Sequence, residues 1–161
     1  MPRLEDVEIG GIVIKTERDV EQQLLEPLLL ELGFGAGDWV RQLKLRVGRA
    51  EKVIPDYVIL SRERPSGLTA RGAWVWEAKL SISTHQQLQR DFEQASSYAR
   101  LVGAAGVGLV SKEGIWLSLK EADYTLDKAK HWSASQSRQS DHLSEIRELA
   151  GKRRMSAYMG E

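Results

Sequence analysis

Apolar residues recur at helical spacing early in the chain and predict a helix over residues 16–32, TERDVEQQLLEPLLLEL. Thr16 and Asp19 have the spacing of a capping box at its start, and Gly33 is a typical stop at its end. Pro27 lies inside the pattern. Because proline has no N–H to donate to the preceding turn, we expect a kink or a short break there.

Alternating apolar and polar positions predict two strands after this helix. The first covers residues 43–47, in which Lys44 and Arg46 share the polar face, and the second is VIPDYVIL, residues 53–60. In the second strand Asp56 falls on an apolar face. A lone carboxylate there is costly unless another group pairs with it, so Asp56 becomes a candidate functional residue.

The segment AWVWEAKL, residues 73–80, alternates again and predicts a third strand. Trp74 and Trp76 share one face, where packing under a helix is the favoured interpretation. Glu77 and Lys79 project together from the opposite face. This strand therefore presents an acid and an amine side by side.

A second long helix is predicted from Thr84, which has capping-box spacing with Gln87, to Gly103. Gln94 and Tyr98 lie one turn apart on the flank of its apolar stripe, from which they could reach a neighbouring site. The sequences VGLV and IWLSL, joined by SKEG, then predict a hairpin.

The periodic pattern weakens after this hairpin. SASQSRQS (133–140) is typical of a loop, and DHLSEIRELAGKRRM predicts one more amphipathic helix. Its inward positions are Leu143, Ile146, Leu149 and Ala150. We expect a core over residues 1–120 and a helical C-terminal extension over 121–161, either within the same domain or at the boundary of a fragment. The order of elements predicts an α/β domain with a mixed sheet of about five strands flanked by helices.

Composition narrows the chemistry. The chain has no cysteine, which excludes thiolate zinc sites, and its three histidines form no zinc-binding pattern, so any metal should be a hard cation held by oxygen. Lys and Arg number 23, as do Asp and Glu, so DNA binding would need a local basic face. No run of about 18 apolar residues could cross a membrane, and MPRLEDVEIG lacks the pattern of a secretion signal, so we expect a cytoplasmic protein.

Hydrolysis of a phosphodiester requires a nucleophilic water and a counter-charge for the transition state, and a bound divalent cation supplies both. Asp56 and Glu77 are suitable ligands for Mg²⁺ or Mn²⁺, and the backbone carbonyl of Ala78 could be a further ligand. Lys79 could orient the attacking water or neutralise the developing charge. The alternative is a structural ion pair at the edge of the sheet, because an E-x-K pattern alone is common in a charged chain.

Four segments in order, TERDVEQQLLEPLLLELGF, PDYVIL, WEAKL and QASSYA, resemble the nuclease domain at the N-terminus of type I restriction enzyme R subunits. That domain belongs to the PD-(D/E)xK superfamily. The resemblance covers roughly residues 12–119. It implies a restriction-endonuclease-like fold and a metal-dependent nuclease in which Asp56, Glu77 and Lys79 are the core metal-binding and catalytic residues.

The resemblance also implies functional residues on both helices. Gln94 and Tyr98 match the family's accessory Q-x-x-x-Y motif, which helps to hold DNA or to order the site. The family's first-helix acid corresponds to Glu17, which fits T-E-x-D-V, or to Glu21, which fits the shorter distance to L-G-F and is expected among the metal ligands. Both could instead be first-turn acids favoured by the helix dipole.

Lys44 and Arg46 are expected to contact DNA phosphates, with solvated charge as the alternative. The chain lacks the G-x-x-x-x-G-K-[ST] loop of a nucleotide-driven motor. It would therefore act alone, as a homodimer, with a separate motor or specificity subunit, or as a fragment of a longer chain. The leading hypothesis is a Mg²⁺-dependent endodeoxyribonuclease in restriction or another form of defence. The alternatives are a structure-specific DNA repair or recombination nuclease and a non-catalytic DNA-binding module on the same fold.

Overall fold

A mixed sheet of six strands forms the centre of the protein in the computed structural model, which describes residues 7–9, 12–47, 51–60 and 72–159. The strand order is β10-β9-β8-β7-β6-β3. The strands are β3 (Trp39–Arg41), β6 (Tyr57–Leu60), β7 (Gly72–Ala78), β8 (Gly106–Ser111), β9 (Gly114–Leu119) and β10 (Lys130–Trp132). β7 and β8 run parallel, and every other neighbouring pair in this sheet is antiparallel.

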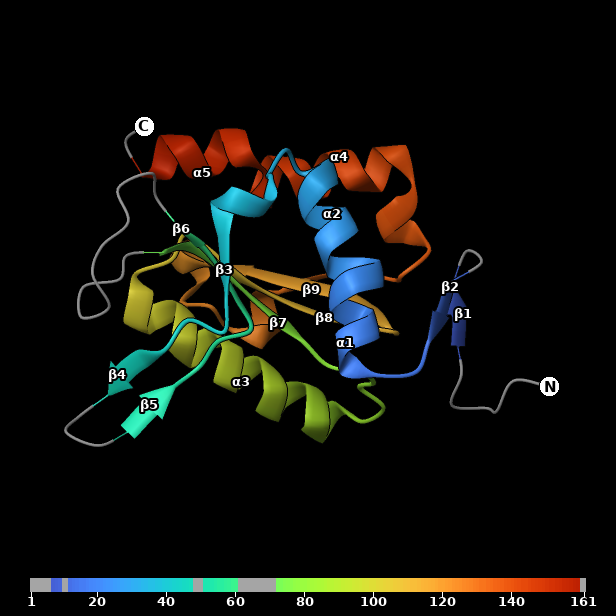
Figure 1. Ribbon diagram of the computed structural model, residues 1–161, viewed down its shortest axis with the longest axis horizontal. Coiled ribbons are helices and arrows are strands. Elements are labelled where there is room, and N and C mark those ends of the chain that lie inside the picture. Colours follow the sequence, from blue (N-terminus) through green and yellow to red (C-terminus); the bar gives the residue numbers. More distant parts are fainter. Residues whose placement is uncertain (1–6, 10–11, 48–50, 61–71, 160–161) are drawn as a thin grey trace.

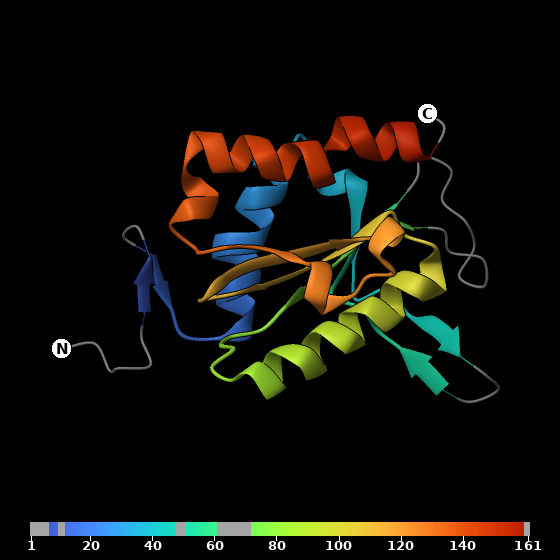
Figure 2. The ribbon, with the colours of Figure 1, turned by 180° about the vertical axis from the view of Figure 1, so that it is seen from behind.

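Helices cover both faces of this sheet, as Figure 1 and the reverse view in Figure 2 show. One face carries α3 (His85–Val102), and the other carries α1 (Glu17–Val20), α2 (Glu26–Glu31), α4 (Ser140–Ala150) and α5 (Lys152–Tyr158). The buried apolar residues divide accordingly into two clusters, one on each face. The chain is thus an α/β protein with a mixed sheet flanked by helices, as its pattern predicts, with six strands in place of about five.

Two short hairpins form separate sheets beside the central one. They are β1 (Val7–Ile9) with β2 (Ile12–Ile14), and β4 (Leu45–Val47) with β5 (Glu51–Val53). Short 3₁₀ helices complete the connections at Ala36–Asp38, Lys120–Ala122, Leu126–Lys128 and Gln136–Arg138. No helix in the described part of the chain combines the length and apolar character needed to cross a membrane.

The two strands predicted over 43–47 and 53–60 are wrong in their extent. Gln42 has a positive φ of 51°, which ends β3 before the first predicted strand begins. Residues 45–47 then pair only with β5 in the small hairpin. Pro55 cannot donate a ladder hydrogen bond, so the second predicted strand is interrupted and Asp56 lies immediately before β6.

The predicted first helix is present and contains one widened turn. Its capping box is confirmed, because Thr16 accepts a hydrogen bond from the Asp19 N–H and the Asp19 carboxylate accepts one from Thr16. Glu21–Leu25 then form a π-helical turn, in which Glu26 donates to the Glu21 carbonyl. This places Pro27 at the start of α2, where its missing N–H is tolerated. The break expected at the proline is therefore a π turn that begins at Glu21.

The tryptophans of β7 are buried as predicted, and glycines in the neighbouring strand make room for them. Trp74 pairs with Gly106 and Trp76 with Gly108 in the parallel register. A Cβ atom on Gly106 would lie 2.4 Å from the Trp74 indole, and one on Gly108 would lie 2.3 Å from that of Trp76. Only glycine fits there, so the register of β7 is fixed and Glu77 is held on the face opposite the indoles.

The C-terminal helix predicted after the polar loop is present, but it is divided into two helices at Gly151. Ile146 and Ala150 of α4 are fully buried, and Leu143 and Leu149 pack against the same cluster, which also contains Trp74. The chain continues after Gly151 as α5. β10 was not predicted, because a three-residue strand is too short to show a period.

Candidate active site

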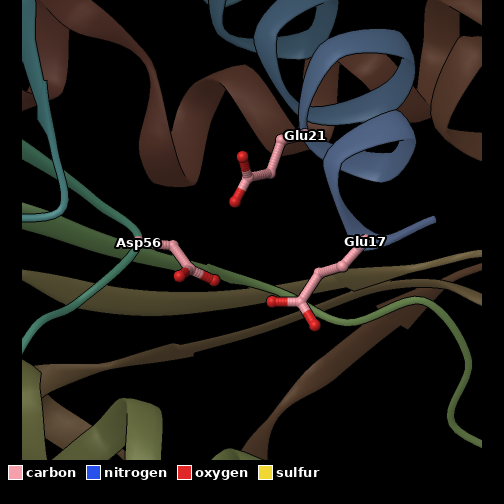
Figure 3. Close-up of side chains that lie close together, drawn as sticks. All are labelled: Glu17, Glu21 and Asp56. Atoms are coloured by element: carbon pink, nitrogen blue, oxygen red, sulfur yellow. The ribbon is translucent and has the colours of Figure 1, made fainter.

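Three carboxylates from two segments converge beside the C-terminal end of β7. Glu17 and Glu21 lie one turn apart on the first helix, and Asp56 precedes β6. Each offers an oxygen within 4.8 Å of the others, and Figure 3 shows the three carboxylates directed toward a common space. The sequence left open whether Glu17 or Glu21 joins the site, and the structure brings both to it.

Asp56 and Glu77 are in direct contact. The backbone N–H of Asp56 donates to Glu77 Oε1 over 2.7 Å, and the backbone N–H of Ala78 donates to Asp56 Oδ2 over 2.9 Å. These two bonds tie the start of β6 to the end of β7. The two acids singled out from separate segments of the sequence therefore lie side by side.

Burial and mutual repulsion make these carboxyl groups hard to ionise. Glu77 is only 4% exposed, and burial followed by the negative charge of Asp56 raises its pKa well above the ordinary value. Burial also raises the pKa of Asp56, which the hydrogen bond from Ala78 opposes. Desolvation, followed by the charge of Asp56, raises the pKa of Glu17. These carboxylates are costly to ionise and offer only oxygen ligands. Such a set fits a hard divalent cation, whose positive charge would replace that of bound protons.

Lys79 lies close enough to act on this cluster. Its positive charge opposes the rise in the pKa of Glu17, of Asp56 and of Glu77. The backbone N–H of Lys79 donates to the Val110 carbonyl over 2.9 Å, so the residue continues the ladder of β7 beyond its last strand position. The backbone of Lys79 is thus fixed by the sheet at the end of β7, two residues after Glu77.

Two arginines that the sequence did not single out for the site bind Glu21. Arg18 Nη1 lies 2.6 Å and Arg41 Nη2 lies 3.0 Å from Glu21 Oε1, and Glu21 is 5% exposed. Arg18 also donates to the Tyr57 hydroxyl over 3.0 Å, and that hydroxyl donates to Glu26. Spacing of three residues in the sequence could have suggested the Arg18–Glu21 pair, whereas the approach of Arg41 depends on the fold.

Tyr98 of α3 lies near the carboxylates of the site, and Gln94 lies one helical turn before it. Burial raises the pKa of Tyr98, and so do the negative charges of Glu77 and Asp56, whereas a side-chain hydrogen bond with Gln94 lowers it. Gln94 is exposed and Tyr98 is buried. Tyr98 therefore lies near enough to Glu77 and Asp56 for their charges to affect it, and the role of the Gln94–Tyr98 pair in the site stays a prediction.

Asp91 is a further acid near the site that the sequence reasoning missed. It lies on α3 three residues before Gln94 and seven before Tyr98, and its negative charge contributes to raising the pKa of Glu17. It is a buried carboxylate on a helix stripe where an apolar residue is expected. That interruption of the apolar stripe was the signal in the sequence.

Neither of the two basic residues predicted to contact DNA takes part in the contacts described for the site. Lys44 is exposed just before β4, and the side chain of Arg46 lies outside the part of the chain that the structure describes. Their contact with DNA stays a prediction, as does the ligand role of the Ala78 carbonyl.

Comparison of the chain with protein-family models, with curated proteins and with solved structures finds no match.

Proposed function

We propose that this chain is a Mg²⁺- or Mn²⁺-dependent deoxyribonuclease of the PD-(D/E)xK kind. The observation that carries the proposal is the contact between Asp56 and Glu77, with Lys79 and the first-helix acids around it. These residues come from the segments that resemble the type I restriction R-subunit nuclease. The mixed sheet between helices is compatible with a restriction-endonuclease-like fold.

Asp56 and Glu77 would hold the cation, with Glu21 and the Ala78 carbonyl as further ligands. The bound cation supplies stabilisation of phosphate charge and a water acidic enough to attack near neutral pH. The Lys79 ammonium orients that water or compensates charge on the phosphate. Glu77 and Lys79 are fixed by β7, and Asp56 is fixed at the start of β6. Rigid positions of this kind would hold the reacting groups in the orientation that the reaction needs.

DNA would be held around this centre by side chains from two regions, α3 and β4. We propose that Gln94 and Tyr98 of α3 order the site or hold DNA. Lys44 lies just before β4 and Arg46 lies in it. Contacts of these two side chains with DNA phosphates would position the duplex. Restriction or another form of defence is the proposed setting, with a homodimer or a separate motor or specificity subunit as the proposed assembly.

Plasmid cleavage tests this function directly. The purified protein with supercoiled plasmid and Mg²⁺ or Mn²⁺ should nick or linearise the DNA, and EDTA should stop the reaction. Asp56→Ala and Lys79→Ala should each lower the rate by roughly 100-fold or more. The exposed neighbours Asp127 and Lys128 offer matched controls, and Asp127→Ala and Lys128→Ala should cleave like the wild type.

Activity that survives either site substitution refutes the assignment. Salt-sensitive DNA binding without cleavage under any divalent metal would identify a non-catalytic binding module instead. A strong preference for branched over linear DNA would favour a repair or recombination nuclease over a restriction enzyme.

A further inference from the structure

Arg18 and Arg41 bring two guanidinium groups to one point beside the candidate active site. Arg18 Nη1 lies 2.6 Å and Arg41 Nη2 lies 3.0 Å from the same oxygen of Glu21, Oε1. One arginine comes from the first helix and the other from the end of β3, so the fold brings the two charges together. Because like charges repel each other, two cations this close need a shared anion. That anion is here the Glu21 carboxylate.

Tyr57 holds both guanidinium groups in place. Arg18 Nη1 donates to the Tyr57 hydroxyl over 3.0 Å, and the guanidinium carbon of Arg41 lies 5.6 Å from the centre of the Tyr57 ring. Tyr57 is fully buried and pairs with Arg41 in the ladder between β6 and β3. A guanidinium group that lies over an aromatic face or donates to a buried hydroxyl loses part of its freedom of movement. The two arginines are therefore oriented before a ligand binds.

Both arginines keep hydrogen-bond donors on the exposed side of this cluster. Glu21 is 5% exposed, whereas the side chains of Arg18 and Arg41 are 40% and 36% exposed. In their hydrogen bonds with the described residues, Arg18 donates only through Nη1 and Arg41 only through Nη2. The other N–H groups of the two planar forks suit the oxygens of a phosphate, with which guanidinium forms paired hydrogen bonds.

The arginine pair lies beside the carboxylates that would hold the metal ion. Glu21 offers an oxygen within 4.8 Å of oxygens of Glu17 and Asp56. Gln42, which follows Arg41, donates its backbone N–H to the Asp56 carbonyl over 2.9 Å. Phosphates of one DNA strand follow each other about every 3.4 Å along the helix axis. A phosphate bound by both arginines is therefore close enough to be the neighbour of the one that is cleaved.

We propose that Arg18 and Arg41 together bind one DNA backbone phosphate, next to the phosphodiester that is hydrolysed. The inference rests on the proposed nuclease function and assigns two further substrate-binding residues to it. Glu21 and Glu26 balance the charges of the two arginines. A divalent cation at Glu21 would add positive charge beside both guanidinium groups, so metal and phosphate should favour each other's binding.

The test is the affinity of the full chain for a short, fluorescently labelled DNA duplex, measured by anisotropy in EDTA over a range of salt concentrations. Arg18→Gln and Arg41→Gln should each weaken binding by roughly tenfold, because each removes charge-assisted hydrogen bonds. Replacing both should reduce the slope of log affinity against log salt by about 0.9, the value for one phosphate, rather than by twice that amount. Arg153→Gln, on the exposed face of α5, is the control and should change neither quantity.

A double lysine variant, Arg18→Lys with Arg41→Lys, keeps both positive charges near Glu21 and so protects the fold. Lysine lacks the planar fork of arginine. The salt dependence should therefore equal that of the wild type, while the affinity falls by about fivefold. Wild-type affinity and salt dependence in the folded double glutamine variant overturn the inference, as does wild-type affinity in the double lysine variant.

The result is separable from the proposed function. Loss of affinity and of salt dependence in the glutamine variants, without plasmid cleavage by the wild type, would support the phosphate site and refute the nuclease. Plasmid cleavage by the wild type, with unchanged DNA binding in the arginine variants, would do the reverse.

Discussion

The backbone N–H of Asp56 donates to the Glu77 carboxylate over 2.7 Å, although the two residues are 21 positions apart in the chain. The return bond from Ala78 to Asp56 closes a short loop of contacts between the start of β6 and the end of β7. Glu77 is buried and Asp56 is half-buried beside two further acids, so negative charge at this place is costly unless a cation compensates it. Removing or compensating this negative charge should therefore change the stability of the protein and its affinity for metal ions.

Glu77→Gln should stabilise the metal-free protein and abolish cleavage. The amide oxygen can still accept the hydrogen bond from Asp56, while the buried negative charge is removed. A gain of about 1 kcal/mol would raise the melting temperature by roughly 2–4 °C for a domain of this size. Thermal unfolding in EDTA, followed by circular dichroism, measures the gain. Glu148→Gln, on the exposed surface of α4, is the control, and a lower melting temperature for Glu77→Gln would contradict the account.

Without divalent ions, the stability contributed by Glu77 should fall as pH rises. Its pKa is raised in the folded chain, so the folded state binds the proton more tightly than the unfolded state does. The contribution is therefore fully present below the ordinary pKa of 4.5, and it is lost as pH rises from 4.5 through the raised value. Urea unfolding in EDTA across this range should show a steeper loss of stability in the wild type than in Glu77→Gln. Identical pH profiles for the two proteins would argue against the raised pKa.

Arg41→Gln should tighten the binding of a divalent cation. Arg41 shares Glu21 Oε1 with Arg18, so removing it deletes a positive charge beside the site and leaves Glu21 with a single arginine. An increase in Mn²⁺ affinity of several-fold is expected, since a unit charge at this distance near a protein surface is worth about 1 kcal/mol or more. Titration calorimetry measures it, with Arg153→Gln on the exposed face of α5 as control. Unchanged or weaker Mn²⁺ binding would exclude Glu21 from the metal site.

Tyr98→Phe should lower cleavage by about tenfold while changing stability by about 1 kcal/mol or less, because it removes one hydroxyl hydrogen bond and keeps the packing. Tyr158→Phe is a matched control, since the Tyr158 hydroxyl donates to the Gly103 carbonyl over 2.6 Å. The control should lose a similar amount of stability and cleave normally. Equal effects on cleavage in the two variants would show that Tyr98 has only a structural role.

The elements with strong local signals could be predicted from the sequence. Thr16 and Thr84 mark helix starts because a side-chain cap is a local interaction, and the alternation around Trp74 and Trp76 gives the two faces of β7. The strand predicted over 43–47 was misjudged because Gln42 has a positive φ, and the strand predicted over 53–60 was misjudged because Pro55 interrupts it; hydrophobic alternation indicates neither effect.

Site residues that share one segment could be predicted from the sequence. Those that only the fold brings together could not. Glu77 and Lys79 follow from the period of a single strand. The arginines on Glu21 and the buried Asp91 depend on how α1, β3 and α3 approach one another. Asp91 differs from an exposed helix acid only by its burial, and burial is a property of tertiary structure.

A crystal structure grown with Mn²⁺ and measured at an anomalous wavelength tests the central claim most directly. The account predicts an anomalous peak about 2.1 Å from carboxylate oxygens of both Asp56 and Glu77. A peak elsewhere, with the Asp56–Glu77 contact unchanged and no ion touching either carboxylate, would contradict it.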